Sequence, residues 1–204
     1  FFLPQAEIGQ GAYTVLAMCI ADELDAKWED IFFEPAPVKE LFNIPGMPMM
    51  LTGNSISVRA RHLQMRQIGA SIRQMLKSAA AKYWKISAEL IQTKNAILIN
   101  TKTKESLPYG FFIDVIKVMK VPEKVTLKEN AELSLIGKPT KRHPKEVWAK
   151  VTGHTQYGID VRLPNMKYAA LIHPRIFGAT LKRFDASAAL KKPGILKVKQ
   201  LPNN

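Results

Sequence analysis

The sequence has a single cysteine, Cys19, so no disulfide bond can form within the chain. Cys19 falls among the apolar residues of an expected helix, which favours a packed thiol over a nucleophile. No apolar run approaches the roughly 18 residues of a membrane-spanning helix. The first residues have neither a basic start nor a small-residue cleavage site, so no signal peptide is expected. These absences argue against a disulfide scaffold and a membrane-spanning chain.

Familiar catalytic and metal-binding patterns are also lacking. The four histidines lie far apart and share no paired spacing with carboxylates or with the cysteine, so no side-chain metal site is expected. No Gly-Lys-Ser/Thr phosphate loop, no G-x-G-x-x-G turn after a strand and no nucleophile elbow occurs. The sequence therefore offers no catalytic residue of its own from these patterns.

Charge is unevenly distributed along the chain, whose net charge is +13. Residues 1–60 carry 3 basic and 8 acidic groups, residues 61–140 carry 14 and 6, and residues 141–204 carry 13 and 3. The basic residues are not interleaved with aromatic ones, and no recognisable reading helix is present, so nucleic acid is not an expected partner. The basic C-terminal half is either a solvated face or a docking face for an acidic partner.

The 47% apolar content is sufficient for a packed core, and the patterns predict an α+β fold. Helical spacing of apolar residues follows Gly11 and ends near Asp25, with Asp22 and Glu23 expected on a solvated face. Ile31–Phe33 predict a short buried strand stopped by prolines. A long helix is expected with Ile68, Ile72, Leu76, Ala79 and Tyr83 on one buried stripe.

The second half of the chain is predicted to contain shorter elements. A hairpin is expected around Lys94-Asn95, followed by a short helix at 109–120. Residues 121–149 show no sustained period and predict a linker. Beyond the linker, the patterns predict a short helix near 186–190 and strands at 167–172, 179–184 and 195–200.

Two polar, glycine-containing turns stand out because each precedes a helix. Free N–H groups at a helix start favour an anion, and glycine lets the backbone approach a phosphate closely. The alternative is ordinary helix capping, with Ser55 or Ser57 as the cap of the long helix. Glu7 beside the first turn is a candidate general acid or base, although a structural carboxylate is favoured. The candidate binding residues are Gly9, Gln10 and Gly11 of the first turn and Thr52, Gly53, Asn54, Ser55 and Ser57 of the second.

Four stretches carry a resemblance to a known family. "AEIGQGAYTVLAMCIADELDA", "LTGNSISVR" and "RQIGASIRQMLKSAAAKYWKI" resemble the molybdopterin-binding subunit of the xanthine dehydrogenase and aldehyde oxidase family, of the isoquinoline 1-oxidoreductase beta-subunit type. Residues 150–198, beginning "KVTGHTQYGIDVRLPNMKYAA", resemble the start of that family's α/β hammerhead domain. The resemblance implies a partial molybdopterin-binding domain at 1–120, a linker at 121–149 and an incomplete hammerhead-like domain at 150–204.

The resemblance also implies a function. The chain would be part of the catalytic subunit of a molybdenum-dependent oxidoreductase that oxidises aldehydes or N-heteroaromatic compounds, with water as the oxygen source. The cofactor would be molybdenum-molybdopterin, with or without a cytosine nucleotide, held by the two turns at residues 9–11 and 52–57. Family members usually have two glycines where this chain has Gly53-Asn54, and asparagine tolerates unusual backbone angles better than most residues.

Further expectations concern what lies beyond these residues. The resemblance places the catalytic glutamate and a glycine-rich loop in a part that this sequence does not contain, so further polypeptide is expected to be required for activity. Expected partners are the rest of the catalytic subunit, from the same gene or a separate chain, an iron-sulfur subunit carrying the clusters, a small-molecule substrate and a cytochrome c as one candidate electron acceptor. The compartment would be the periplasm or its membrane face, with the cytoplasm as the alternative. The alternative function is a non-catalytic binding or assembly module that docks an acidic partner.

Overall fold

The computed structural model describes residues 1–201, which form two units at residues 1–161 and 162–201. The last three residues of the predicted 150–204 domain lie outside the described residues. Within this range no helix has both the length and the apolar content for crossing a bilayer. Helices of the first unit are α1 (Ala12–Leu24), α2 (Ile56–Arg59), α3 (His62–Trp84), α4 (Ile113–Ile116) and α5 (Pro144–Val151). Its strands are β1 (Phe2–Leu3), β2 (Glu34–Pro35), β3 (Ile91–Lys94), β4 (Ile97–Asn100) and β5 (Ser106–Pro108).

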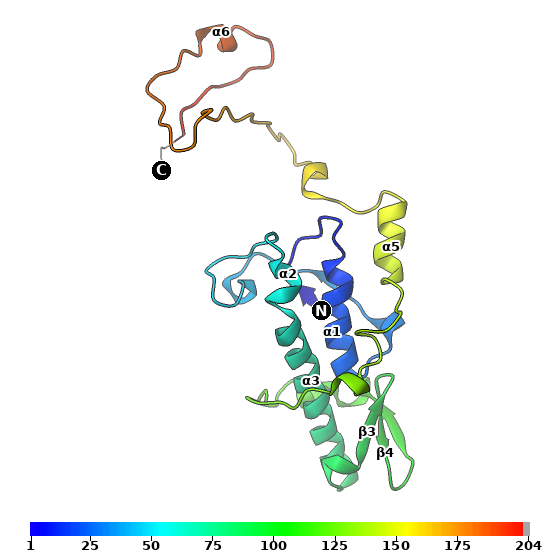
Figure 1. The fold of residues 1–204 in the computed structure, drawn as a ribbon. Helices are drawn as coiled ribbons and strands as arrows, with labels where there is room; N and C mark the ends of the chain where they lie inside the picture. The colour runs from blue at the N-terminus through cyan, green and yellow to red at the C-terminus, as the bar shows by residue number, and fades with distance from the viewer. Residues whose placement is uncertain (202–204) are drawn as a thin grey trace. The chain divides into compact units, whose positions relative to one another are not determined.

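The core of the first unit is built around the packing of α1 on α3 (Figure 1). Gly69 on α3 makes this close approach possible, because a Cβ there would lie 2.5 Å from the carbonyl oxygen of Ile20. One apolar cluster surrounds α1 and includes Leu16 and Ile20. A second joins α3 to the β3–β4–β5 sheet through Leu76. The predicted α+β class is confirmed at this level.

The buried face of α3 differs in part from the predicted stripe. Leu76 and Ala79 are buried as expected, whereas Ile68 and Tyr83 are exposed by 38% and 54%. The reason is that α1 packs on the small residue Gly69 and its neighbours, which turns Ile68 away from the contact. Hydrophobic spacing therefore located the helix but misjudged its buried face.

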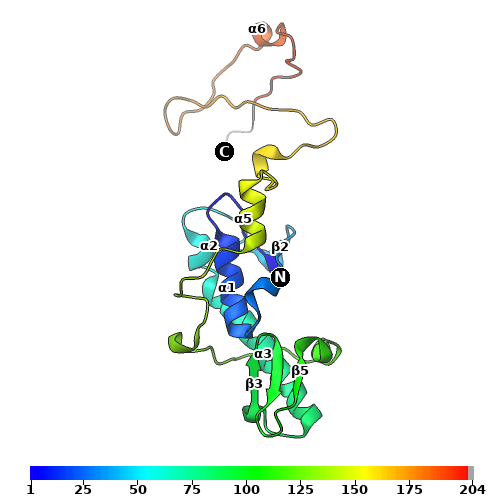
Figure 2. The same cartoon turned by 90° about the vertical axis from the view of Figure 1, so that its right-hand side faces the viewer.

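The strands confirm one prediction and correct another. The hairpin β3–β4 turns through Asn95 and Ala96, which both have positive φ, as the two central residues of a type I′ turn do (Figure 2). The strand predicted at Ile31–Phe33 lies instead at β2, where it pairs in parallel with β1. Pro35 fits there because the ladder uses the N–H groups of Glu34 and Ala36, which donate to Phe1 and Leu3 at 2.9 Å.

Asp22 corrects the expectation of a solvated helix face, because its side chain is only 1% exposed. Its carboxylate accepts hydrogen bonds from the backbone N–H of Ser134 (2.7 Å), Leu135 (3.1 Å) and Ile136 (2.9 Å), and from the Ser134 hydroxyl. A buried carboxylate with four donors is satisfied, so burial is tolerated.

Glu23 also differs from the prediction of a solvated helix face, because it is 0% exposed. It bonds to Arg66 at 2.8 Å and pairs with Arg73 at 3.5 Å, both on α3, and it accepts from the N–H of Lys128. The segment at 121–149, predicted as a linker, is thus packed along α1 and contains the start of α5, while the domain boundaries themselves stay a prediction. The amino-acid composition of residues 121–149 did not predict this packing, because the segment binds two carboxylates on α1 that are far away in the sequence.

The second unit contains α6 (Ser187–Leu190), which confirms the predicted short helix. The strands predicted at 167–172, 179–184 and 195–200 are absent from its described residues. A strand needs a neighbouring strand for its backbone groups, and this unit supplies no ladder within its described part. Its large apolar side chains are exposed, as Ile172 (99%) and Phe177 (106%) show.

Replacing Asp22 with alanine is expected to lower the free energy of unfolding by about 3–5 kcal/mol, because four donors lose their acceptor. Urea denaturation followed by circular dichroism measures this change. Asp114→Ala is the matched control, since that carboxylate is 94% exposed and its loss should change stability by less than about 0.5 kcal/mol. Equal stability of the two variants would contradict the central role of Asp22.

Candidate functional site

The first turn, Gly9-Gln10-Gly11, leads into α1 through two residues in the left-handed region. Gly9 has φ of 94° and Gly11, the N-cap of α1, has φ of 78°. The Gln10 side chain folds back on the same loop, accepting from the N–H of Ile8 at 2.8 Å and donating to the carbonyl of Ala6 at 3.1 Å. No side chain of the described residues caps α1. Gln10 therefore shapes the turn, and the first N–H groups of α1 are left to another acceptor.

The second turn, Thr52–Ser57, has a different relation to its helix from the predicted one. It opens the four-residue α2, and the long α3 begins only at His62, after a break. Ser55 is the N-cap of α2, but its hydroxyl makes no capping hydrogen bond. Asn54 and Ser55 have φ of 47° and 53°, so Asn54 does adopt the unusual angle expected of it. Ser55 therefore precedes a different helix from the predicted one, and it does so without a side-chain cap.

A hydrogen bond joins the two turns, which lie 46 residues apart in the sequence. The N–H of Ala6, just before the first turn, donates to the Thr52 hydroxyl at 2.7 Å. Thr52 thus has a structural partner, whereas the hydroxyls of Ser55 and Ser57 bond to nothing within residues 1–201. The sequence patterns concern each turn separately, and the structure brings the two together.

Open space lies beside some of these glycines and not beside others. A Cβ on Gly11 would meet Nη2 of Arg142, the far end of a flexible side chain that can move aside, so it is the positive φ that requires glycine there. Gly9 needs glycine for its φ, and nothing lies within 4 Å of its Cβ position. Gly53 has neither a left-handed φ nor a neighbour within 4 Å of its Cβ position. Among the candidate residues, Gly53 is thus the glycine that the described fold does not explain.

The start of α5 lies against the start of α1 and supplies residues that the sequence analysis missed. Thr14 on α1 donates to the Glu146 carboxylate and accepts from the N–H of His143 at 3.3 Å. Lys150 bonds Glu146 on the same helix and lies 3.2 Å from Glu7. Pro at the first helical position and a Glu-Lys pair four residues apart could have predicted α5.

Glu7 has the structural role that the sequence favoured. Its Oε1 accepts from the N–H of Gly9 at 2.5 Å and pairs with Lys150. Its Oε2 is buried and has no hydrogen-bond partner among the described residues. Glu7 therefore ties the first turn to α5 and keeps one oxygen unsatisfied.

Cys19 is a packed thiol, as predicted. The residue is 4% exposed, and burial, opposed only in part by Arg66, raises its pKa to about 11. Across the described chain, no three His, Cys, Asp or Glu side chains gather as metal ligands would.

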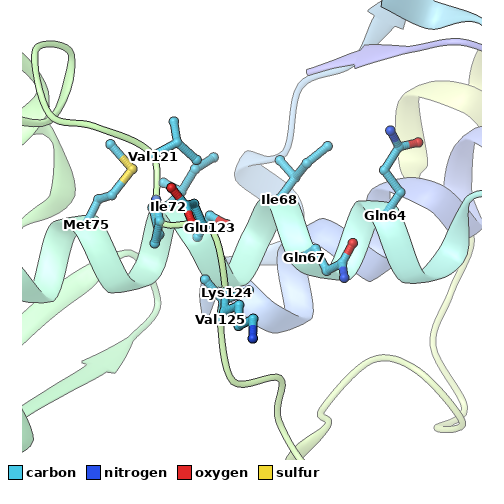
Figure 3. A pocket seen from close by; sticks show the side chains of 11 residues that line it. Gln64, Gln67, Ile68, Ile72, Met75, Val121, Glu123, Lys124 and Val125 are labelled. Carbon is cyan, nitrogen blue, oxygen red and sulfur yellow. The ribbon is translucent and has the colours of Figure 1, made fainter.

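Two hollows mark the surface of the first unit. One is an open groove where Val121–Val125 crosses α3 above Ile72 and Met75 (Figure 3). The groove contains none of the predicted binding residues. The other, of about 640 Å³, lies beside the first turn and is lined in part by Gln5, Glu7 and Lys150.

The pKa of Glu146 gives a test of the contact between α5 and α1. Burial alone would raise this pKa, but hydrogen bonds from Lys150 and Thr14 and the nearby positive charges hold it below the ordinary 4.5. A depressed pKa stabilises the fold above about pH 4.5, and this contribution is lost as the pH falls through the folded-state value. Glu146→Gln is therefore expected to be less stable than the unchanged chain at pH 7, and the difference should be smaller at about pH 3. Urea denaturation at both pH values measures this, and a constant difference would contradict it.

Comparison with known proteins gives three relatives that cover nearly the whole chain. The beta subunit of isoquinoline 1-oxidoreductase from Brevundimonas diminuta is 27% identical over 98% of this chain. A membrane-bound aldehyde dehydrogenase (pyrroloquinoline-quinone) of Gluconacetobacter polyoxogenes is 26% identical over 95% of it. A nicotinate dehydrogenase subunit of Pseudomonas putida is 22% identical over 97% of it.

The chain spans only 30%, 25% and 17% of the lengths of these relatives. No family model matches the chain. The similarity confirms the resemblance predicted from the sequence stretches. The chain is similar to the isoquinoline 1-oxidoreductase beta subunit and to subunits of two further oxidoreductases.

Proposed function

We propose that this chain supplies one wall of a molybdenum-molybdopterin site in an oxidoreductase that acts on aldehydes or N-heteroaromatic compounds. The oxidoreductase class rests on the three relatives. The assignment of this cofactor, these substrates and an iron-sulfur partner to this chain is the part that we propose. When bound, the cofactor supplies the redox chemistry, and the protein binds and orients it.

Gly53 is the observation that carries the proposal. Its backbone conformation and its surroundings would both accept a side chain, yet the position is occupied by the smallest residue. Close approach of a ligand to the backbone is a physical reason for such a glycine. Gly110 shares both properties, but Gly53 lies in the turn that the Thr52 hydroxyl joins to the first turn. The neighbouring hydroxyls of Ser55 and Ser57 are free for the same ligand, and positive φ at two consecutive residues turns the local backbone toward it.

The first turn would act together with the second. The N–H groups at the start of α1 carry partial positive charge, which favours a phosphate or another anionic group. Gln10 orients the turn through its bonds to Ala6 and Ile8, so its contribution to binding is through the backbone. Arg142 lies against Gly11 and makes only a loose ion pair with Glu146, at 3.7 Å. Its guanidinium adds positive charge beside the turn.

A second candidate function rests on a different part of the chain. Residues 162–201 contain nine basic residues and one acidic residue, and their apolar side chains are exposed. This favours docking of an acidic polypeptide with an apolar surface. The two functions differ in their cofactor requirement, because a pure docking module needs no molybdenum. For either function, a periplasmic location or a site at the periplasmic membrane face stays our proposal.

Gly53→Ala tests the cofactor site without disturbing the fold. An added methyl group meets no protein atom within 4 Å and requires no change of φ, so thermal stability should be unchanged. Molybdenum per chain, measured by elemental analysis together with pterin fluorescence, is expected to fall about tenfold or more, because the methyl group occupies the space of the ligand. Gly110→Ala is the matched control, since Gly110 also has an ordinary φ and open space.

The outcomes separate the alternatives. Full molybdenum content in Gly53→Ala would refute the role of the second turn. A purified complex without molybdenum or pterin would refute the cofactor assignment and favour the docking module. A quinone in place of molybdenum would favour the cofactor that appears in the name of the aldehyde dehydrogenase relative.

A further inference from the structure

The outward face of residues 111–118, the segment that contains α4, is apolar. Phe111, Val115 and Val118 recur at the spacing of one helix face, and they are exposed by 53%, 47% and 86%. The opposite face of this segment already packs into the second apolar cluster through Phe112, Ile116 and Met119. The packed core therefore explains only one of the two apolar faces, and an exposed apolar surface commonly marks an interaction site.

Tyr83, near the end of α3, extends this exposed surface. It is 54% exposed, and its ring lies 5.3 Å from the Phe111 ring in an edge-to-face arrangement. Both rings also contact the buried ring of Phe112, with centroids 5.8 and 5.0 Å apart, which holds them in place. None of these exposed side chains lines either of the two hollows described above. We define the α4 patch as Tyr83, Phe111, Val115 and Val118.

Exposed lysines flank the α4 patch on both sides. They are Lys82, Lys85, Lys117 and Lys120. Two of them form ion pairs at 2.9 Å with Asp114 and Glu123, but these pairs lie at the surface, where such pairs are weak. Lys82 and Lys85 form no ion pair within residues 1–201. The rim of the patch therefore carries more positive than negative charge.

An apolar patch with a rim of lysines has charge complementarity to an acidic protein or to an anionic lipid surface. Protein interfaces are enriched in arginine and depleted in lysine, and no arginine occurs between residues 74 and 141. Lysines beside exposed aromatic and aliphatic side chains are typical of segments that lie on anionic bilayers. Tyr83 suits the headgroup region, because its ring is apolar and its hydroxyl is polar. These features favour the lipid surface.

We propose that the α4 patch binds the surface of an anionic lipid bilayer. Phe111, Val115 and Val118 enter the boundary between headgroups and acyl chains, and the lysines contact the lipid phosphates. The patch is separate from the candidate cofactor turns. Tyr109, which precedes it, donates its hydroxyl hydrogen to the carbonyl of Leu24 at 2.7 Å, at the opposite end of α1 from the first turn. The 13 residues of α1 span roughly 20 Å, so the two sites do not overlap.

Flotation of the full chain with vesicles tests the proposal, using pure phosphatidylcholine and an equal mixture of phosphatidylcholine and phosphatidylglycerol. Val118→Glu should weaken binding to the anionic vesicles about tenfold or more, because a carboxylate enters the apolar boundary and is repelled by the lipid charge. Val151→Glu on α5 is the matched control, since Val151 is also highly exposed, at 76%, and lies outside the patch. It should bind within about twofold of the unchanged chain. Residues 162–201 are also basic, so the difference between the two variants is the quantity that decides.

Thermal melts of both variants should match the unchanged chain, because both positions are exposed. Binding should also fall at high salt, as an electrostatic contact with the headgroups requires. An equal loss in the two variants, or equal binding with and without phosphatidylglycerol, would overturn the proposal. Binding to soluble poly-glutamate that depends on Val118, without vesicle binding, would overturn it in favour of an acidic protein. None of these outcomes depends on molybdenum, so they are independent of the proposed function.

Discussion

The buried carboxylates of Asp22 and Glu23 fix the arrangement on which the candidate site depends. Both lie near the end of α1, and between them they bind the backbone of residues 128–136 and two arginines of α3. A buried carboxylate is stable only while its donors stay in place. Glu23 therefore helps to hold α3 and Lys128 against α1, and Asp22 holds residues 134–136 there. Residues 128–150 form the returning segment, which runs back along α1.

This returning segment runs antiparallel to α1. It contacts Asp22 with Ser134, reaches Thr14 with Glu146, and meets Glu7 with Lys150. The Glu7 carboxylate then holds the N–H of Gly9, so a chain of polar contacts extends from the buried end of α1 to the first turn. The conformation of that turn thus depends on residues far away in the sequence.

Local patterns in the sequence were sufficient for α1, the β3–β4 hairpin, α6 and the positions of both turns. Glycine positions and helical periodicity are local signals, and these elements depend mostly on residues that are close in the sequence. The buried state of Asp22 and Glu23 could not be predicted, because acidic residues on an amphipathic helix usually face water, and the donors that reverse this are distant. The strands predicted in the second unit failed for the related reason that a strand has no stability without a partner.

The two turns differ in how much of their composition the fold itself explains. Gly9 and Gly11 are both required by their positive φ. Asn54 and Ser55 tolerate the left-handed region at some cost, which a structural turn alone would avoid by placing glycine there. Glycine stands instead at position 53, where the described fold needs none. Gly110 is equally free of any demand for glycine, so the glycine favours a ligand at position 53 only together with the hydrogen bond that joins its turn to the first one.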